Sequence, residues 1–258
     1  MCSIEDVMRG QGTEIIVVDG TTSALNCAEA YQKIWGCHRV VAVDTEGFRE
    51  PNLVSLIQIA SASGVLVQTI EVNLPIAIKA LLEDPSILKI FFSAADDIER
   101  LERGFGCYPA QVVDLQALTV CEHDSRAHSL VEGINRLRTG GLYGPLTKES
   151  FGKRGFQKYP PEQLVHVPGF ISYAAGDAWA TLRGFESWLR LLPKQRYQRR
   201  SGATQHSIYS TVHKIRDYRT RLRYQRLLSE NTLTRAQILR FCSAVSKRSS
   251  ITAPHLRR

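Results

Sequence analysis

The apolar positions of the chain fall into short runs separated by charged or turn-forming residues. Several runs hold aliphatic and β-branched residues in consecutive or alternating order, which is typical of strands. We expect these strands over residues 13–19, 39–47, 53–61, 64–72 and 86–94. A further short strand is expected within residues 110–118, where it leads into a helix.

Other segments place apolar residues three or four positions apart, which is the spacing of a helix. We expect these helices over residues 21–36, 74–85, 95–106, 129–137 and 170–192. The first has Thr22 or Ser23 as its N-cap and ends at Gly36. Residues 139–169 are rich in Gly, Pro and Lys and are expected to be irregular.

Helices that alternate with the later strands predict an α/β fold, with a mixed β-sheet flanked by helices. The 258 residues suffice for one sizeable domain and an appendage. The composition changes after Pro193. We therefore expect a first domain over residues 1–192 and a basic, mostly helical C-terminal extension over residues 193–258.

Charge separates these two parts strongly. Residues 1–190 carry 17 Lys or Arg and 23 Asp or Glu, whereas residues 191–258 carry 16 and 2. A basic segment of this density is typical of a surface that binds a polyanion such as nucleic acid. A solvated helical face, a targeting signal or a contact with a protein partner would also explain it.

The six cysteines have no paired spacing, which favours free thiols in a reducing compartment over a zinc site or disulfides. No apolar run approaches the length of a membrane span, and the first ten residues do not resemble a signal or transit peptide. We expect an intracellular protein of the nucleus or cytoplasm that has no membrane partner.

Two carboxylates stand near the end of the predicted strand 39–47. Asp44 and Glu46 are two residues apart, so their side chains point to the same face. Such acids repel each other unless a cation lies between them, and oxygen ligands suit Mg²⁺ or Mn²⁺. Taken alone, the pair is better explained as a polar strand end with two solvated acids.

Two further acids lie on predicted helices. Asp97 precedes Leu101 by four positions, which places it on the packed face of its helix, while Asp96 points away. Asp177 and Tyr173 lie one turn apart, beside an apolar stripe. Four carboxylates can hold two divalent ions about 3.5–4 Å apart, an arrangement suited to in-line attack on a phosphodiester.

The stretches "AVDTEG…LVSLIQIAS", "LLEDPSILKIFFSAADDIERL", "VVDLQAL" and "YAAGDAWATL" together resemble the DEDDy-type 3′–5′ exonuclease family. Ribonuclease D, the Rrp-six-type exosome nuclease and the Werner exonuclease domain belong to this family. The motifs "DTEG" and "VVDLQAL" are most similar to its Egalitarian-like branch, some of whose members are RNA-binding adaptors. The resemblance covers about residues 13–190.

The resemblance implies an RNase H-like fold, two Mg²⁺ or Mn²⁺ ions, and release of nucleoside 5′-monophosphates from the 3′ end of RNA or DNA. It implies that Asp44, Glu46 and Asp177 are metal ligands, and that Asp97 is a ligand or acts through water. Tyr173 would position the attacking water. Asp114 is expected to be structural.

Residues that bind the single-stranded substrate are expected in the irregular stretch and in the basic extension. These candidates are Lys153, Arg154, Phe156, Lys158, Arg199, Arg200, Arg219, Arg221 and Arg223. RNA is slightly favoured over DNA by the branch resemblance. The alternative function is a catalytically idle adaptor or complex subunit that uses the nuclease fold as a scaffold for binding nucleic acid.

Overall fold

A computed structural model describes residues 2–47, 54–116, 129–137, 146–147, 159 and 161–195. A mixed sheet of six strands forms its centre, in the order β2-β5-β4-β3-β6-β7. These strands are β2 (Ile15–Val18), β3 (Val40–Glu46), β4 (Leu56–Ser61), β5 (Gly64–Thr69), β6 (Leu88–Phe91) and β7 (Val112–Asp114). Strand β4 is antiparallel to β3 and β5, and the other neighbours are parallel.

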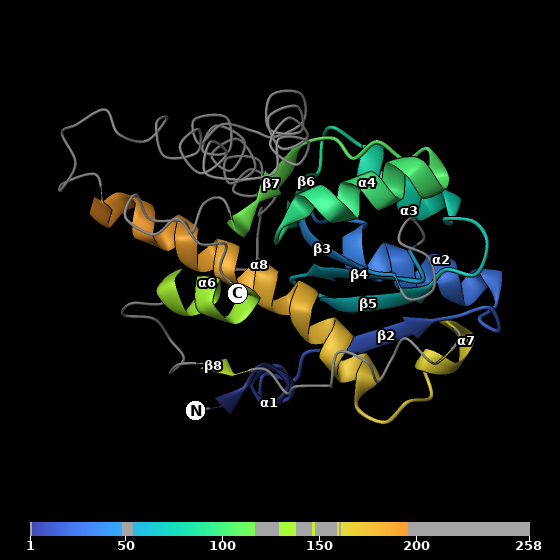
Figure 1. The fold of residues 1–258 in the computed structure, drawn as a ribbon, viewed down its shortest axis with the longest axis horizontal. Coiled ribbons are helices and arrows are strands. Elements are labelled where there is room, and N and C mark those ends of the chain that lie inside the picture. The colour runs from blue at the N-terminus through green and yellow to red at the C-terminus, as the bar shows by residue number, and fades with distance from the viewer. Residues whose placement is uncertain are drawn as a thin grey trace, which may run out of the picture.

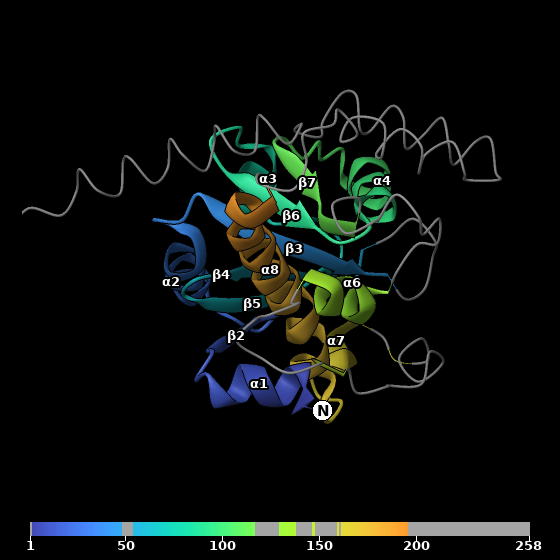
Figure 2. The same ribbon diagram turned by 90° about the vertical axis from the view of Figure 1, so that its left-hand side faces the viewer.

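Helices cover both faces of the sheet (Figures 1 and 2). The described helices are α1 (Ile4–Gly10), α2 (Ala24–Trp35), α3 (Ile76–Glu83), α4 (Ala94–Phe105), α6 (Leu130–Leu137), α7 (Pro161–Leu164) and α8 (Phe170–Gln195). The core on one face contains residues of α1, α6 and α8, and the core on the other contains residues of α2, α3 and α4. Side chains of β3 alternate between the two cores: Ala42 belongs to the first, and Val41 and Val43 belong to the second.

The six sheet strands and the helices α2, α3, α4, α6 and α8 were all expected from the sequence, with ends that shift by a few residues. Ser23 is the N-cap of α2, and its hydroxyl accepts a hydrogen bond from the Asn26 N–H at 3.2 Å. Helix α8 was expected to end at residue 192, but it continues through Pro193 to Gln195.

The N-terminal helix α1 was not expected. It has only seven residues, too few for a periodic pattern to be recognised in the sequence. The Ser3 hydroxyl caps it by accepting the Asp6 N–H at 3.0 Å, and its buried residues Ile4 and Met8 pack into the α8-side core. Packing against α8 therefore explains a helix that local propensity does not predict.

Two short elements interrupt the stretch 139–169 that was expected to be irregular. Strand β8 (Leu146–Thr147) pairs in parallel with β1 (Cys2–Ser3), and α7 precedes α8. Most of the remaining stretch lies outside the described residues. Both elements are shorter than the window over which sequence periodicity becomes visible.

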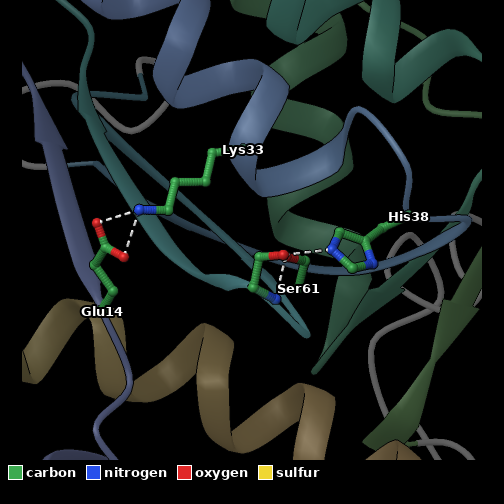
Figure 3. A network of polar contacts seen from close by, with 5 residues as sticks. Glu14, Lys33, His38 and Ser61 are labelled. Atoms are coloured by element: carbon green, nitrogen blue, oxygen red, sulfur yellow. Dashed lines mark hydrogen bonds and ion pairs between the residues drawn. The ribbon is translucent and has the colours of Figure 1, made fainter. Parts of the chain in front are cut away.

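Polar contacts connect α2 and the loop after it to one end of the sheet. This end is opposite to the one at which β3 has its carboxyl end. Lys33 of α2 forms an ion pair with Glu14, just before β2, with an N–O distance of 2.6 Å (Figure 3). After α2, His38 Nε2 lies 2.7 Å from the hydroxyl of Ser63 in the β4–β5 turn. These contacts join surface segments. The acidic residues Asp44 and Glu46 lie at the opposite end of the sheet.

Candidate metal centre

The acidic site begins at the carboxyl end of β3, between β4 and β6 in the sheet. Asp44 and Glu46 are both half-buried and lie on the face that α8 covers, since they alternate with the buried residue Thr45. Asp44 lies opposite Gln58 of β4, and Glu46 lies opposite Leu56. Pairing with β4 thus fixes the backbone of both acids.

Helix α8 brings the third carboxylate to this place. It begins after Gly169, whose φ of 77° lies in the left-handed region that glycine adopts without strain. The helix then crosses β3 and β4 with three fully buried small residues, Ala174, Ala175 and Ala178, in its core-facing stripe. Small side chains let a helix approach a sheet closely, and Asp177 is thereby buried at 7% exposure.

Asp44, Glu46 and Asp177 each offer a carboxylate oxygen, and these three oxygens lie within 4.8 Å of one another. Three like charges at this distance disfavour one another when all are ionised. A hard divalent cation relieves the repulsion and prefers such oxygen ligands, so the residues present fit Mg²⁺ or Mn²⁺. Exposed acidic patches are common on protein surfaces, but this group differs from them because Asp177 is buried.

Asp97 approaches the same strand end from the opposite side of the sheet. It lies in the first turn of α4 and is 7% exposed, whereas its neighbour Asp96 is exposed, as their helical positions predicted. Its carboxylate accepts a hydrogen bond from the Thr45 hydroxyl at 2.5 Å. The structure therefore does not place Asp97 within the group of three oxygens but connects it to β3 through Thr45.

The surroundings of Asp97 disfavour its charge. Burial, with smaller contributions from the nearby charges of Glu46 and Asp96, raises the pKa of its carboxyl to about 7. The Thr45 hydrogen bond and the charge of Arg100 oppose this shift. A buried acid so close to the charge of Glu46 shows that Asp97 belongs electrostatically to the acidic centre.

Tyr173 lies on α8, one turn before Asp177. Its side chain is partly buried and packs against the α8-side core, and its backbone N–H donates to the Gly169 carbonyl at 3.0 Å. The four-residue separation places the phenol and the Asp177 carboxylate on the same side of the helix. Tyr173 is therefore on the same side of α8 as the third acid of the cluster.

Asp114 ends β7 and has a different environment. Its carboxylate accepts hydrogen bonds from the backbone N–H groups of Ser93, Ala94 and Gln116, at 3.1, 3.2 and 2.9 Å. Ser93 has a φ of 64°, a left-handed conformation that is costly for a residue with a side chain. Asp114 therefore holds the start of α4 in place.

Two polar residues at this end of the sheet were missed by sequence reasoning. Thr45 lies between the two acids of β3, and Gln58 is a single polar residue within the apolar run of β4. A polar side chain that interrupts an apolar strand next to candidate ligands was the available signal. The expected nucleic-acid-binding residues Lys153, Arg154, Phe156, Lys158, Arg199, Arg200, Arg219, Arg221 and Arg223 lie outside the described residues.

Among solved structures, several nucleases share this architecture. Brucella melitensis NrnC bound to pGG is 20% identical, with a TM-score of 0.55 over 84% of this chain and 95% of its own. Escherichia coli RNase D, an exoribonuclease involved in structured RNA processing, is 18% identical, with a TM-score of 0.54 over 83% of this chain and 50% of its own. The catalytic core of RRP6 from Trypanosoma brucei is 18% identical, with a TM-score of 0.56 over 82% and 52%. These similarities confirm the RNase H-like α/β fold.

No curated protein matches the chain in sequence. Among the described helices, none combines the length and the apolar character that a membrane span requires. A family model for a 3′–5′ exonuclease matches residues 16–192, more than half of the chain. The chain therefore belongs to the 3′–5′ exonuclease family of hydrolytic enzymes, as its motifs predicted.

Proposed function

We propose that this exonuclease holds two divalent ions, Mg²⁺ or Mn²⁺, at Asp44, Glu46, Asp97 and Asp177, and removes nucleoside 5′-monophosphates from the 3′ end of single-stranded nucleic acid. The observation that carries the proposal is the convergence of three carboxylates from β3 and α8 within 4.8 Å. Bound Mg²⁺ in Brucella NrnC supports the choice of ion. The complex of Trypanosoma brucei RNase D with RNA U12 supports RNA over DNA.

The ions, when bound, would supply activation of a water molecule and stabilisation of the charge that develops on the phosphoryl group and the leaving 3′-oxygen. Asp44, Glu46 and Asp177 hold the ions directly. Asp97 is fixed by Thr45 at the far side of β3, and it contributes as a ligand or through an intervening water.

Tyr173 is proposed to position the attacking water. Its place one turn before Asp177 supports this role, because residues four apart lie on the same side of a helix. A hydrogen bond from the phenol restricts the water to one direction of attack, which raises the rate by orientation. The phenol orients the water and need not remove its proton.

The C-terminal extension, residues 193–258, is proposed to bind the substrate backbone, with residues 1–192 as the nuclease domain. Its 16 basic residues include Arg199, Arg200, Arg219, Arg221 and Arg223, and it contains two acids. Lys153, Arg154, Phe156 and Lys158 are proposed to contact phosphates and stack a base near the third motif. The positive charge of the extension would also suit an acidic protein partner.

We also propose that the protein acts in the nucleus or cytoplasm.

The test of catalysis uses a 5′-labelled RNA with a 3′ overhang and the matching DNA, each with Mg²⁺, Mn²⁺ or EDTA. The wild-type protein should produce a 3′-to-5′ ladder that requires the metal, and Asp44→Ala should abolish it. Glu71→Ala is the matched control, because Glu71 is an exposed acid outside the cluster. Its ladder should equal that of the wild type.

Failure of the wild type to degrade either substrate would contradict the catalytic proposal. If the same protein still shifted the RNA in a binding gel, the nucleic-acid-binding adaptor would replace the exonuclease as the proposed role. Comparison of the two ladders also measures the preference for RNA over DNA.

The role of the extension is tested by ending the chain after Gln195, where α8 ends. RNA binding should weaken, and the slope of log affinity against log salt should become flatter, because fewer phosphates are neutralised. An unchanged slope would show that the extension does not contact the nucleic acid.

A further inference from the structure

Gln58 is a buried amide next to the acidic centre. It lies in the middle of β4 and is 0% exposed. Among the described residues, neither its amide nitrogen nor its amide oxygen has a hydrogen-bond partner. Buried polar groups in folded proteins are nearly always hydrogen-bonded, so an amide in this state calls for an explanation.

The register of the sheet puts this amide beside a proposed metal ligand. Gln58 and Asp44 lie directly opposite each other in the antiparallel pair β3–β4, so their side chains share a face. Residues in this relation have Cβ atoms about 4.5–5.5 Å apart. That face is the one covered by α8, whose core contains Leu56 and Ala60, two residues away from Gln58 on either side.

A second glutamine shows what an amide in this sheet does when it serves the fold. Gln68 of β5 is also buried, at 5% exposure. Its amide oxygen accepts the Tyr31 hydroxyl at 2.9 Å, and its amide nitrogen donates to the Thr69 carbonyl at 2.9 Å. Gln68 therefore has a structural role that Gln58 lacks.

We propose that Gln58 is a positioning residue, which donates an amide N–H to the Asp44 carboxylate when that carboxylate binds a divalent ion. A neutral amide can donate a hydrogen bond to the carboxylate oxygen that does not bind the ion. It adds no positive charge that would repel the ion. It also holds the carboxylate in one orientation, as hydrogen-bond partners of metal ligands commonly do. The inference rests on the proposed metal site.

The test measures Mn²⁺ binding by calorimetry without substrate, together with the melting temperature of the metal-free protein. Gln58→Met and Gln58→Leu replace the amide by apolar side chains of similar size. Each should raise the Kd for Mn²⁺ about 10- to 100-fold. The metal-free melting temperature should stay the same or rise, because an unpaired buried amide is removed.

Gln68→Met is the matched control on the neighbouring strand. It removes two hydrogen bonds, so it should lower the metal-free melting temperature while leaving the Kd for Mn²⁺ unchanged. A residue with a purely structural role would behave in this way. The opposite pattern, weaker metal binding without lower stability, is what a positioning role predicts for Gln58.

The outcomes separate the two proposals. If the wild type binds Mn²⁺ and either folded Gln58 variant binds it equally well, the positioning role is wrong and the metal site stands. If the wild type binds no Mn²⁺, the metal site itself is wrong, and the inference about Gln58 falls with it.

Discussion

Asp97 and Asp114 are both buried carboxylates near the first turn of α4, and their surroundings differ. Asp114 accepts hydrogen bonds from three backbone N–H groups. They connect the start of α4 to the segment that follows β7. Asp97 accepts the hydroxyl of Thr45 and lies near the charges of Glu46 and Asp96, and burial raises its pKa to about 7. An acid saturated by backbone donors stabilises the fold, whereas an acid buried beside other acids costs stability and indicates a function.

Among the changes that test this comparison, the largest effect is expected from Asp97→Asn. The amide keeps an oxygen for the Thr45 hydroxyl but loses the charge, so hydrolysis should fall by about 10³-fold, the size typical of losing one preorganised catalytic group. The melting temperature should stay the same or rise, because a buried charge is removed. The measurement is the initial rate of RNA degradation, with the exposed Asp96→Asn as control. A large loss of stability would make Asp97 a structural acid like Asp114.

Asp114→Ala should show the reverse pattern. It leaves three backbone N–H groups without their acceptor, and the free energy of unfolding should fall by about 3 kcal/mol. Urea unfolding measures this loss. At temperatures where the variant remains folded, its rate per molecule should be close to that of the wild type. Wild-type stability in this variant would contradict the structural role.

Lys89→Met measures how much a buried charge outside the acidic cluster lowers the free energy of unfolding. Lys89 is 0% exposed, its Nζ donates to the Asp84 carbonyl at 2.6 Å, and burial lowers its pKa from 10.5 to about 8. Below pH 8 both states hold the proton, so the folded protein bears the full cost of the buried charge. Between pH 8 and 10.5 the unfolded chain binds more protons, so Lys89 makes stability rise with pH.

Methionine fills similar space without the charge, so Lys89→Met should raise the free energy of unfolding by about 1 kcal/mol at pH 7. The advantage over the wild type should shrink as the pH rises from 8 towards 10.5. Urea unfolding at pH 7 and pH 9.5 checks both statements. A constant difference at the two pH values would show that Lys89 keeps its proton in the folded protein.

The smallest effect is expected from Ser93→Gly, next to the hydrogen bonds of Asp114. Ser93 has a φ of 64° and a ψ of 52°, which glycine adopts without steric cost. Glycine also gains freedom in the unfolded chain, so the net gain in stability should be no more than about 1 kcal/mol. Thermal unfolding measures it. A lower melting temperature would mean that the serine side chain itself stabilises the turn.

Sequence reasoning identified what depends on neighbours along the chain. Alternation placed Asp44 and Glu46 on one face, and helical spacing placed Asp97 on the packed side of α4. The approach of Asp177 to β3 depends on how α8 crosses the sheet, which no local pattern contains; the family motifs supplied that grouping.

The features that could not be predicted depend on packing between distant segments. Helix α1 forms because α8 buries Ile4 and Met8. The significance of Gln58 appears only when β4 pairs with β3 and puts it opposite Asp44. Within an isolated strand it is one polar residue in an apolar run.

The division of the acidic cluster between β3 and α8 has a consequence during synthesis. Asp44 and Glu46 leave the ribosome early, and Asp177 follows only after almost the whole nuclease domain. The group of three oxygens cannot exist before α8 docks on the sheet. We therefore expect a nascent chain to be inert towards the messenger RNA from which it is being translated, with activity arising only when α8 is in place.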